Sequence, residues 1–196
     1  MITKSAARLL TAARQLLSVA PTGLWYHGRP GRHGKGLTMR PGVSSTSGGP
    51  AHAIPLFLSP AKSFARLYTD HHGYVYTVRP HVHKTFDAYD LQTPEAKWHD
   101  AREDYTEEGK QLFDDLHDGK IFPGMEDDEE EFLGTLKAIL RMNYDVMEDG
   151  HMVNWLKKNG YDSFYVTGDG EKNLAVFDLR NVEVIDVELV GNPDKF

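Results

Sequence analysis

The chain has 196 residues, of which 40% are hydrophobic and 26% charged, and it contains no cysteine. A chain of this size can bury one substantial core, so we expect a single domain over residues 1–196. The lack of cysteine excludes a disulfide framework and a thiolate metal site. No apolar run approaches the roughly 20 residues that cross a bilayer. We therefore expect a cytoplasmic protein with no membrane partner.

The net charge of −7 is unevenly distributed. Nine basic residues and no acidic residue precede Asp70, whereas the remainder carries 13 basic and 29 acidic residues. If the first third folds as one surface, its positive potential suits a phosphate-bearing ligand. The alternative is that the acidic remainder of the same molecule neutralises this segment, and charge alone does not separate the two.

Hydrophobic residues at helical spacing mark the start of the chain. Leucine and alanine recur every three or four positions with arginines between them, and Pro21 ends the pattern. We predict an amphipathic helix over residues 1–20 whose apolar stripe packs on its own domain.

The run from Gly23 to Gly28 is short, aromatic and bounded by turn residues, which predicts a buried strand. His27 lies at the end of this strand, where a scaffold often presents a polar group to a cleft. A core histidine that bonds to the backbone is the alternative. The glycine-rich residues 29–55 predict a long loop, without a phosphate-loop or dinucleotide fingerprint.

A second apolar strand is predicted over residues 56–58, followed by a helix that Ser59 caps and Pro60 opens. Phe57 at the strand end and Tyr68 near the helix end approach His27 if the two strands are neighbours. Plain core packing is the alternative for both aromatic residues.

Strand and helix patterns alternate through the rest of the chain. Residues 74–78 and 182–190 alternate like strands, the latter with one wet face, and residues 92–149 are helical in pattern, with a helix starting at Thr106. The histidines between residues 71 and 83 have no carboxylate at a recognisable metal-ligand spacing, so no metal is expected.

Three parts of the chain carry a family resemblance. Tyr26-His27-Gly28, the segment 56–68 and the segment 155–178 resemble the ADP-ribosyltransferase superfamily in order and spacing. The likeness is to small bacterial and phage-type, toxin-like members, in the branch whose NAD pocket holds a histidine-glycine pair and two tyrosines. It implies an α+β fold with a split, mainly antiparallel β-sheet, here with an N-terminal helix and a helical insertion over residues 92–149.

The resemblance also implies roles for individual residues. His27 would hydrogen-bond a ribose hydroxyl of NAD, the Gly28 backbone would hold the nicotinamide carboxamide, and Tyr68 would stack on the nicotinamide ring. Phe57 stands where the branch has its other aromatic residue, and it keeps the stacking face without the hydroxyl. Ser59 would help to orient the ribose, as a serine does in the arginine-modifying branch.

The third motif departs from the family. Active members hold a glutamate just before the last motif's strand, where it stabilises the ribosyl cation that forms as nicotinamide leaves. The corresponding residue here is Asn173, which supplies no charge. Glu171 faces the same side if the strand has begun by then. Either Glu171 acts as the catalytic residue, or the enzyme works with a weaker set of groups, or the site binds without catalysis. Both residues are otherwise ordinary hairpin residues.

The resemblance therefore implies a mono-ADP-ribosyltransferase of the glycosyltransferase class, with Glu171, Asn173 and His27 as catalytic candidates. NAD would be its substrate and no metal would be needed. The acceptor would be a macromolecule, with protein favoured over nucleic acid. Two alternatives stay open. One is an inactive module that binds NAD or ADP-ribose, and the other is an interaction protein that uses the acidic helical insertion and keeps a vestigial cleft.

Overall fold

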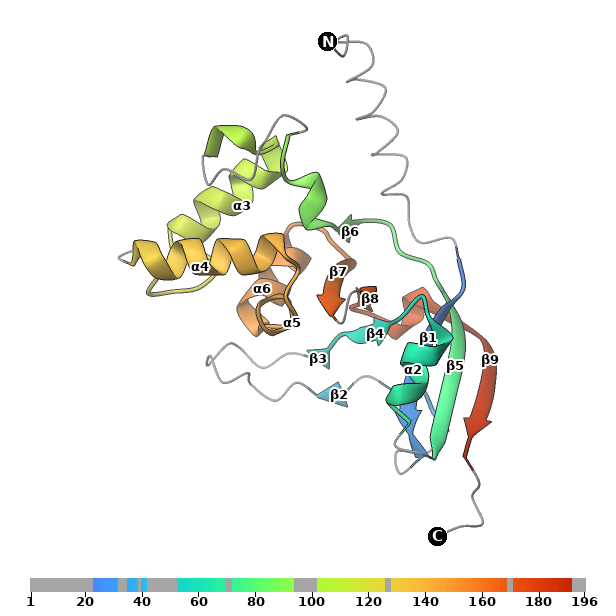
Figure 1. Ribbon diagram of the computed structural model, residues 1–196. Helices are drawn as coiled ribbons and strands as arrows, with labels where there is room; N and C mark the ends of the chain where they lie inside the picture. The colour runs from blue at the N-terminus through green and yellow to red at the C-terminus, as the bar shows by residue number, and fades with distance from the viewer. Residues whose placement is uncertain are drawn as a thin grey trace, which may run out of the picture.

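The computed structural model describes residues 23–31, 35–38, 40–41, 53–69, 72–93, 102–125, 128–168 and 171–191. The helix predicted over residues 1–20 and most of the glycine-rich loop lie outside this set. The described part is a mixed α+β structure, in which a central sheet lies between a group of helices and a second sheet (Figure 1). No helix within it is long and apolar enough to cross a membrane.

The first sheet has three antiparallel strands in the order β1 (Trp25–Pro30), β5 (Gly73–Pro80) and β9 (Val182–Val190). All three strands were predicted. The expected single wet face of β9 is not found, because a bulge leaves Ile185 without a partner between Val184 and Asp186. Val184 and Ile185 are both 43% exposed, which is typical of a bulged edge strand.

The second sheet has four strands in the order β4 (Leu56–Leu58), β8 (Glu171–Val176), β7 (Ser163–Gly168) and β6 (Thr85–Phe86). Its pairs are antiparallel except β6 with β7, which run parallel. Together with the first sheet it gives the mainly antiparallel pairing that the sequence predicts. A short pair, β2 (Arg40–Pro41) with β3 (Ala53–Ile54), is separate from both.

A backbone bridge joins the two sheets between β1 and β4. Tyr26 and Ser59 exchange backbone hydrogen bonds of 2.8 Å in both directions. Beyond this bridge the strands diverge, so a space opens between the two sheets on the side of the helix α2 (Lys62–Leu67).

Alternation along the strands divides the hydrophobic core in two. Phe164 and Ala175 point from the central sheet toward the helices and belong to the larger cluster. Leu58 and Leu174 point the other way, against Trp25 and the first sheet. Each face of the central sheet is therefore buried, as its apolar sequence requires.

The helical region consists of α3 (Glu107–His117), α4 (Glu129–Leu140), α5 (Tyr144–Met147) and α6 (Gly150–Lys158). Short 3₁₀ turns at Ala88–Asp90 and Arg102–Asp104 precede α3, and a third at Leu179–Asn181 connects β8 to β9. The predicted start at Thr106 is confirmed, since its side chain caps α3 by accepting the N–H of Gly109. The helices run past residue 149, the end predicted for the insertion.

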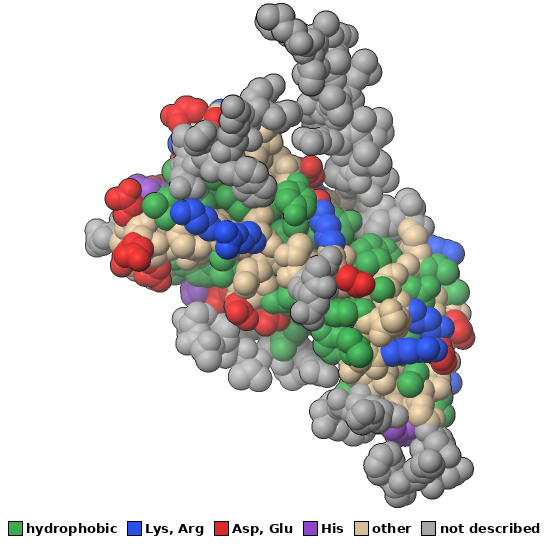
Figure 2. All heavy atoms as spheres, viewed as in Figure 1, with side chains coloured by type: hydrophobic (Ala, Val, Ile, Leu, Met, Phe, Trp, Pro, Cys, Tyr) green, Lys and Arg blue, Asp and Glu red, His purple; other side chains and the backbone are tan. Residues whose placement is uncertain are grey.

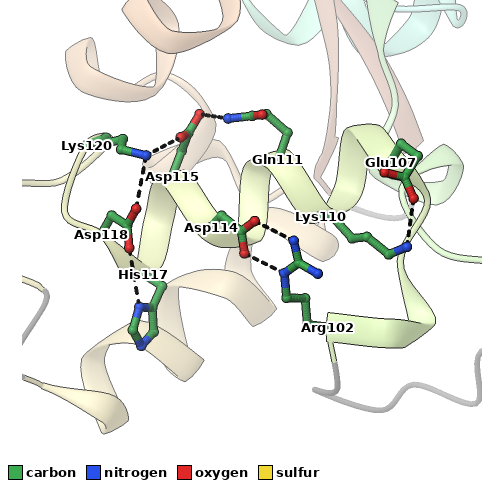
Figure 3. A network of polar contacts seen from close by, with 9 residues as sticks. All are labelled: Arg102, Glu107, Lys110, Gln111, Asp114, Asp115, His117, Asp118 and Lys120. Atoms are coloured by element: carbon green, nitrogen blue, oxygen red, sulfur yellow. Dashed lines mark hydrogen bonds and ion pairs between the residues drawn. The ribbon is translucent and has the colours of Figure 1, made fainter.

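A buried carboxylate ties α3 to its neighbours. Asp115 accepts a 2.9 Å hydrogen bond from the indole Nε1 of Trp155 on α6. Figure 3 shows the same carboxylate between Gln111 and Lys120, at 2.7 and 3.1 Å. Burial alone would raise the pKa of Asp115. The hydrogen bonds outweigh burial and hold its pKa below the usual range.

The predicted cap of α2 is wrong. The helix begins at Lys62 with Ala61 at the N-cap, and Ser59 lies three residues before its start. The reason is the backbone bridge to Tyr26, which keeps Ser59 extended. Its hydroxyl oxygen still accepts the N–H of Ala61 at 3.0 Å, so Ser59 orders the turn that leads into the helix.

Candidate functional site

A cleft of about 740 Å³ opens where the two sheets diverge. Strands β1 and β4 form its floor, α2 forms one wall and α5 contributes to another. The described residues that line it are Tyr26, His27, Gly28, Arg29, Thr38, Ile54, Pro55, Leu56, Phe57, Leu58, Ser59, Phe64, Ala65, Tyr68, Tyr144, Glu148 and Asn173. Its size and mixed lining are those of a small-molecule site.

Six of the residues predicted from sequence meet in this cleft: His27, Gly28, Phe57, Ser59, Tyr68 and Asn173. They come from three segments that are far apart along the chain. The seventh, Glu171, is not among the described lining residues and reaches the cleft through Ser59.

His27 is held across the junction of the sheets. Its Nδ1 lies 2.9 Å from the carbonyl oxygen of Phe57. Because a carbonyl oxygen only accepts, Nδ1 carries a hydrogen and donates it to Phe57. His27 and Phe57 are thus close together, as expected, and the contact is made by the Phe57 backbone carbonyl rather than by its ring.

Gly28 allows α2 to lie directly against β1. A Cβ atom at this position would come within 1.7 Å of the backbone oxygen of Ala65. Along β1 the Gly28 N–H and C=O point to the same side as those of Tyr26, away from β5 and toward β4. Since β4 has diverged by then, these groups face the cleft that Gly28 lines.

The two aromatic residues predicted as a pair stand on different walls. Tyr68 follows the last residue of α2, is 53% exposed, and contacts Phe64 with ring centroids 5.5 Å apart. The Phe57 ring packs against Tyr144 at 5.2 Å and Phe164 at 6.4 Å. Phe57 therefore lines the cleft and also packs in the core, whereas the Tyr68 residue is more than half exposed.

Asn173 is buried in the cleft with its hydrogen-bonding capacity unused. It is 2% exposed, and neither its Nδ2 nor its Oδ1 has a partner among the described residues. An amide in this state costs about 1–3 kcal/mol. It offers a ligand one acceptor and two donors.

Glu171 is the first residue of β8 and therefore shares a face with Asn173, as expected if the strand had begun. Its Oε2 accepts a 3.1 Å hydrogen bond from the Ser59 hydroxyl. The Ser59 hydroxyl, which the resemblance assigns to orienting the ribose, therefore donates to Glu171. The hydrogen bond holds the Glu171 carboxylate next to Ser59, which itself lines the cleft.

The lining residues that were not predicted as site residues include Arg29, Tyr144 and Glu148. Tyr144 lies in the region for which only a helical pattern was predicted. Arg29 follows Gly28 directly, and its basic character was noted only in the charge of the first third. No sequence pattern marks Glu148 as a site residue, because its position at the cleft depends on the packing of α5 against β4.

Two of the basic residues of the first third are neutralised within the molecule. Lys62 and Arg66 on α2 each lie 2.6 Å from the carboxylate of Glu188 on β9. Figure 2 shows basic and acidic side chains together over α2 and β9. For these two residues the neutralisation alternative is correct, and among the described residues Arg29 is the basic side chain that lines the cleft.

No group of three or more potential metal-ligating side chains occurs among the residues that the structure describes. Of the histidines discounted as metal ligands, His81 has its Nε2 3.3 Å from the Glu183 carboxylate.

Comparisons with known proteins add little to this geometry. No family model matches the sequence, and no curated protein matches it. A search of solved structures finds similarity to the crystal structure of an anti-CRISPR protein, with 14% sequence identity and a TM-score of 0.44, over 86% of this chain and 95% of that chain. Similarity at this level supports no conclusion about function.

Proposed function

We propose that the protein is a mono-ADP-ribosyltransferase with a fold of that type, which cleaves NAD at the nicotinamide–ribose bond and transfers ADP-ribose to a macromolecular acceptor. A protein is the favoured acceptor. The observation that carries the proposal is the meeting of three sequence motifs in one cleft, with His27, Gly28, Tyr68 and Asn173 all lining it.

The nicotinamide end of NAD fits between β1 and α2. Tyr68, which lines the cleft and is 53% exposed, provides an aromatic ring on which a planar ring can stack. The backbone N–H and C=O of Gly28 provide a donor and an acceptor that match a carboxamide. The His27 ring, oriented by the Phe57 carbonyl, is placed to hydrogen-bond a ribose hydroxyl.

The diphosphate of NAD needs positive charge. Arg29 follows Gly28 on β1 and lines the same cleft. Its guanidinium donates to the Gly36 carbonyl, which holds the side chain near the cleft. A guanidinium pairs with phosphate oxygens in a two-pronged geometry, so Arg29 is our candidate for the diphosphate.

The chemistry is a substitution at the ribose C1′. The C1′–N bond breaks, its electron pair stays on the pyridine nitrogen, and nicotinamide leaves as a neutral molecule. The ribose then carries a cationic, oxocarbenium-like centre. A nucleophile from the acceptor, or water, forms the new bond to C1′ and loses a proton. Groups fixed in advance around this cation lower the barrier.

Nicotinamide release from NAD tests the proposal. We expect the wild-type protein to release nicotinamide and the Tyr68→Ala variant to lose at least tenfold in kcat/KM, because the stacking surface is gone. Tyr89→Ala is the matched control, since Tyr89 is also an exposed tyrosine and does not line the cleft. Equal activity of the two variants would contradict the placement of nicotinamide on Tyr68.

A second function is favoured by one observation. The residue at the expected catalytic position is the uncharged Asn173, so a module that binds NAD or ADP-ribose without turnover fits the same cleft. This module would bind NAD with an affinity that depends on Tyr68, and it would release no nicotinamide with or without cell extract as a source of acceptors.

A further inference from the structure

The cleft contains one carboxylate among its described lining residues, and it comes from the helical region. Glu148 directly follows α5, and its N–H bonds to the Tyr144 carbonyl oxygen at 2.9 Å. Residues four apart on a helix share a face. The ring of Tyr144 packs on Phe57 of β4, so Glu148 faces the same cleft one turn later.

The backbone before α5 is held against the central sheet. Met142, two residues after the end of α4, has a left-handed conformation with φ of 52°, which favours glycine. The N–H of Thr167 on β7 bonds to the Met142 carbonyl at 2.9 Å, and Asn143 forms a bridge with Thr167. Strained residues persist where the surrounding packing holds them, and they concentrate near functional sites. These contacts place α5, and with it Glu148, firmly beside the central sheet.

The reaction proposed above needs negative charge near the ribose C1′, and the two residues expected to supply it do not do so directly. Asn173 is neutral. Glu171 accepts the hydroxyl of Ser59 and is not among the residues that line the cleft. A carboxylate in a water-poor cleft stabilises a nearby cation far more than it does in water.

We propose that Glu148 is the catalytic carboxylate of this cleft, and this inference rests on the proposed function. Its charge faces the ribosyl cation while the C1′–N bond breaks and the electron pair leaves with nicotinamide. The unpartnered amide of Asn173 holds a ribose hydroxyl, and Glu171 acts through Ser59 as a positioning residue. The catalytic charge thus comes from the helical insertion and not from the strand of the third motif.

The test compares nicotinamide release by the wild-type protein with that by Glu148→Gln, Glu171→Gln and Asp145→Asn. Glu148→Gln keeps the shape and removes the charge, so we expect kcat to fall about 100-fold or more with KM little changed, as for an interaction made in the transition state. Asp145→Asn changes an exposed carboxylate on the same helix and is expected to leave both constants unchanged. Thermal unfolding of each variant verifies that it is folded.

The outcomes separate the inference from the function on which it rests. Release by the wild type with full activity in Glu148→Gln overturns the inference and leaves the proposed function standing. A larger loss in Glu171→Gln than in Glu148→Gln also overturns it, because the charge then lies at Glu171. No release by the wild type, with or without cell extract, overturns the proposed function and the inference with it.

Discussion

Asn173 is the residue whose surroundings most favour a bound ligand in the cleft. A buried amide without partners destabilises the folded protein, and an apolar residue of similar shape at this position would avoid that cost. Active sites commonly carry such a cost because they must bind something else. The sequence predicted the position of Asn173 on the strand. It could not predict that no neighbour would satisfy the amide, because that depends on residues from β4 and β7.

We predict that Asn173→Leu stabilises the protein and weakens NAD binding. Leucine has the branched shape of asparagine and carries methyl groups in place of the two unsatisfied polar atoms, so the free energy of unfolding should rise by about 1–2 kcal/mol. Urea unfolding and NAD titration measure the two effects. Asn154→Leu, on α6 outside the cleft, serves as the control and should leave NAD affinity unchanged. A destabilised Asn173→Leu protein would show that the amide has a structural partner.

The packing of α2 on β1 depends on the missing side chain of Gly28. The backbone of Ala65 occupies the space that any Cβ would need. The strand, the helix and the importance of the His27-Gly28 pair were all predicted from sequence. The close approach of the helix to the strand was not, because a glycine within a strand pattern is equally typical of a bulge or a sharp bend.

We predict that Gly28→Ala forces α2 away from β1. The new Cβ would lie 1.7 Å from the Ala65 oxygen, a backbone atom that cannot rotate away. Overpacking of this kind costs about 1–3 kcal/mol or more, which lowers Tm by at least several degrees in a domain of this size. Because Tyr68 moves with the helix, KM for NAD should also rise. Gly23→Ala, which meets no atom within 4 Å, should change neither quantity, and equal behaviour of the two variants would refute the packing described here.

Short elements were the least predictable part of the fold. The helix α5 has four residues and begins after the strained Met142, yet the sequence reads as one continuous apolar helix face from Phe132 to Met147. Periodicity does not reveal this break, because the apolar residues keep their spacing across it. Ser59 was likewise misread as a cap, since its pairing with Tyr26 joins segments 33 residues apart.

At the scale of the molecule, a polar network holds the helices together around Asp115. Its carboxylate pairs with Lys120 and with the buried N–H of Trp155, and its pKa is held below the usual range. A carboxyl with a lowered pKa in the folded state stabilises the protein above its unfolded pKa of about 4. That contribution is lost as the pH falls through the lowered value.

We therefore predict that Asp115→Asn flattens the loss of stability in acid. Urea unfolding between pH 7 and pH 3 should show a smaller decrease for the variant than for the wild type, together with lower stability at pH 7. The control is Asp114→Asn, which removes an exposed ion pair with Arg102 and should have a smaller effect at pH 7. An acid transition identical to that of the wild type would contradict the role given to Asp115.

The cleft assembles residues from both halves of the sequence, and this limits what sequence alone predicts. Three motifs could be matched by their order, and the structure places six of their residues around one space. Glu148 and Tyr144 join them from the region that was predicted as an insertion. Nothing local marks these two residues, because their place in the cleft follows from how α5 packs on the central sheet.

The most direct test of NAD cleavage is to follow NAD, nicotinamide and ADP-ribose by chromatography, with purified wild-type protein and cell extract as a source of acceptors. We predict that NAD is consumed and that nicotinamide appears in equal amount to ADP-ribose, counted both free and attached to protein. Intact NAD after prolonged incubation, in parallel with an active control enzyme, would contradict the assignment of this cleft to NAD cleavage.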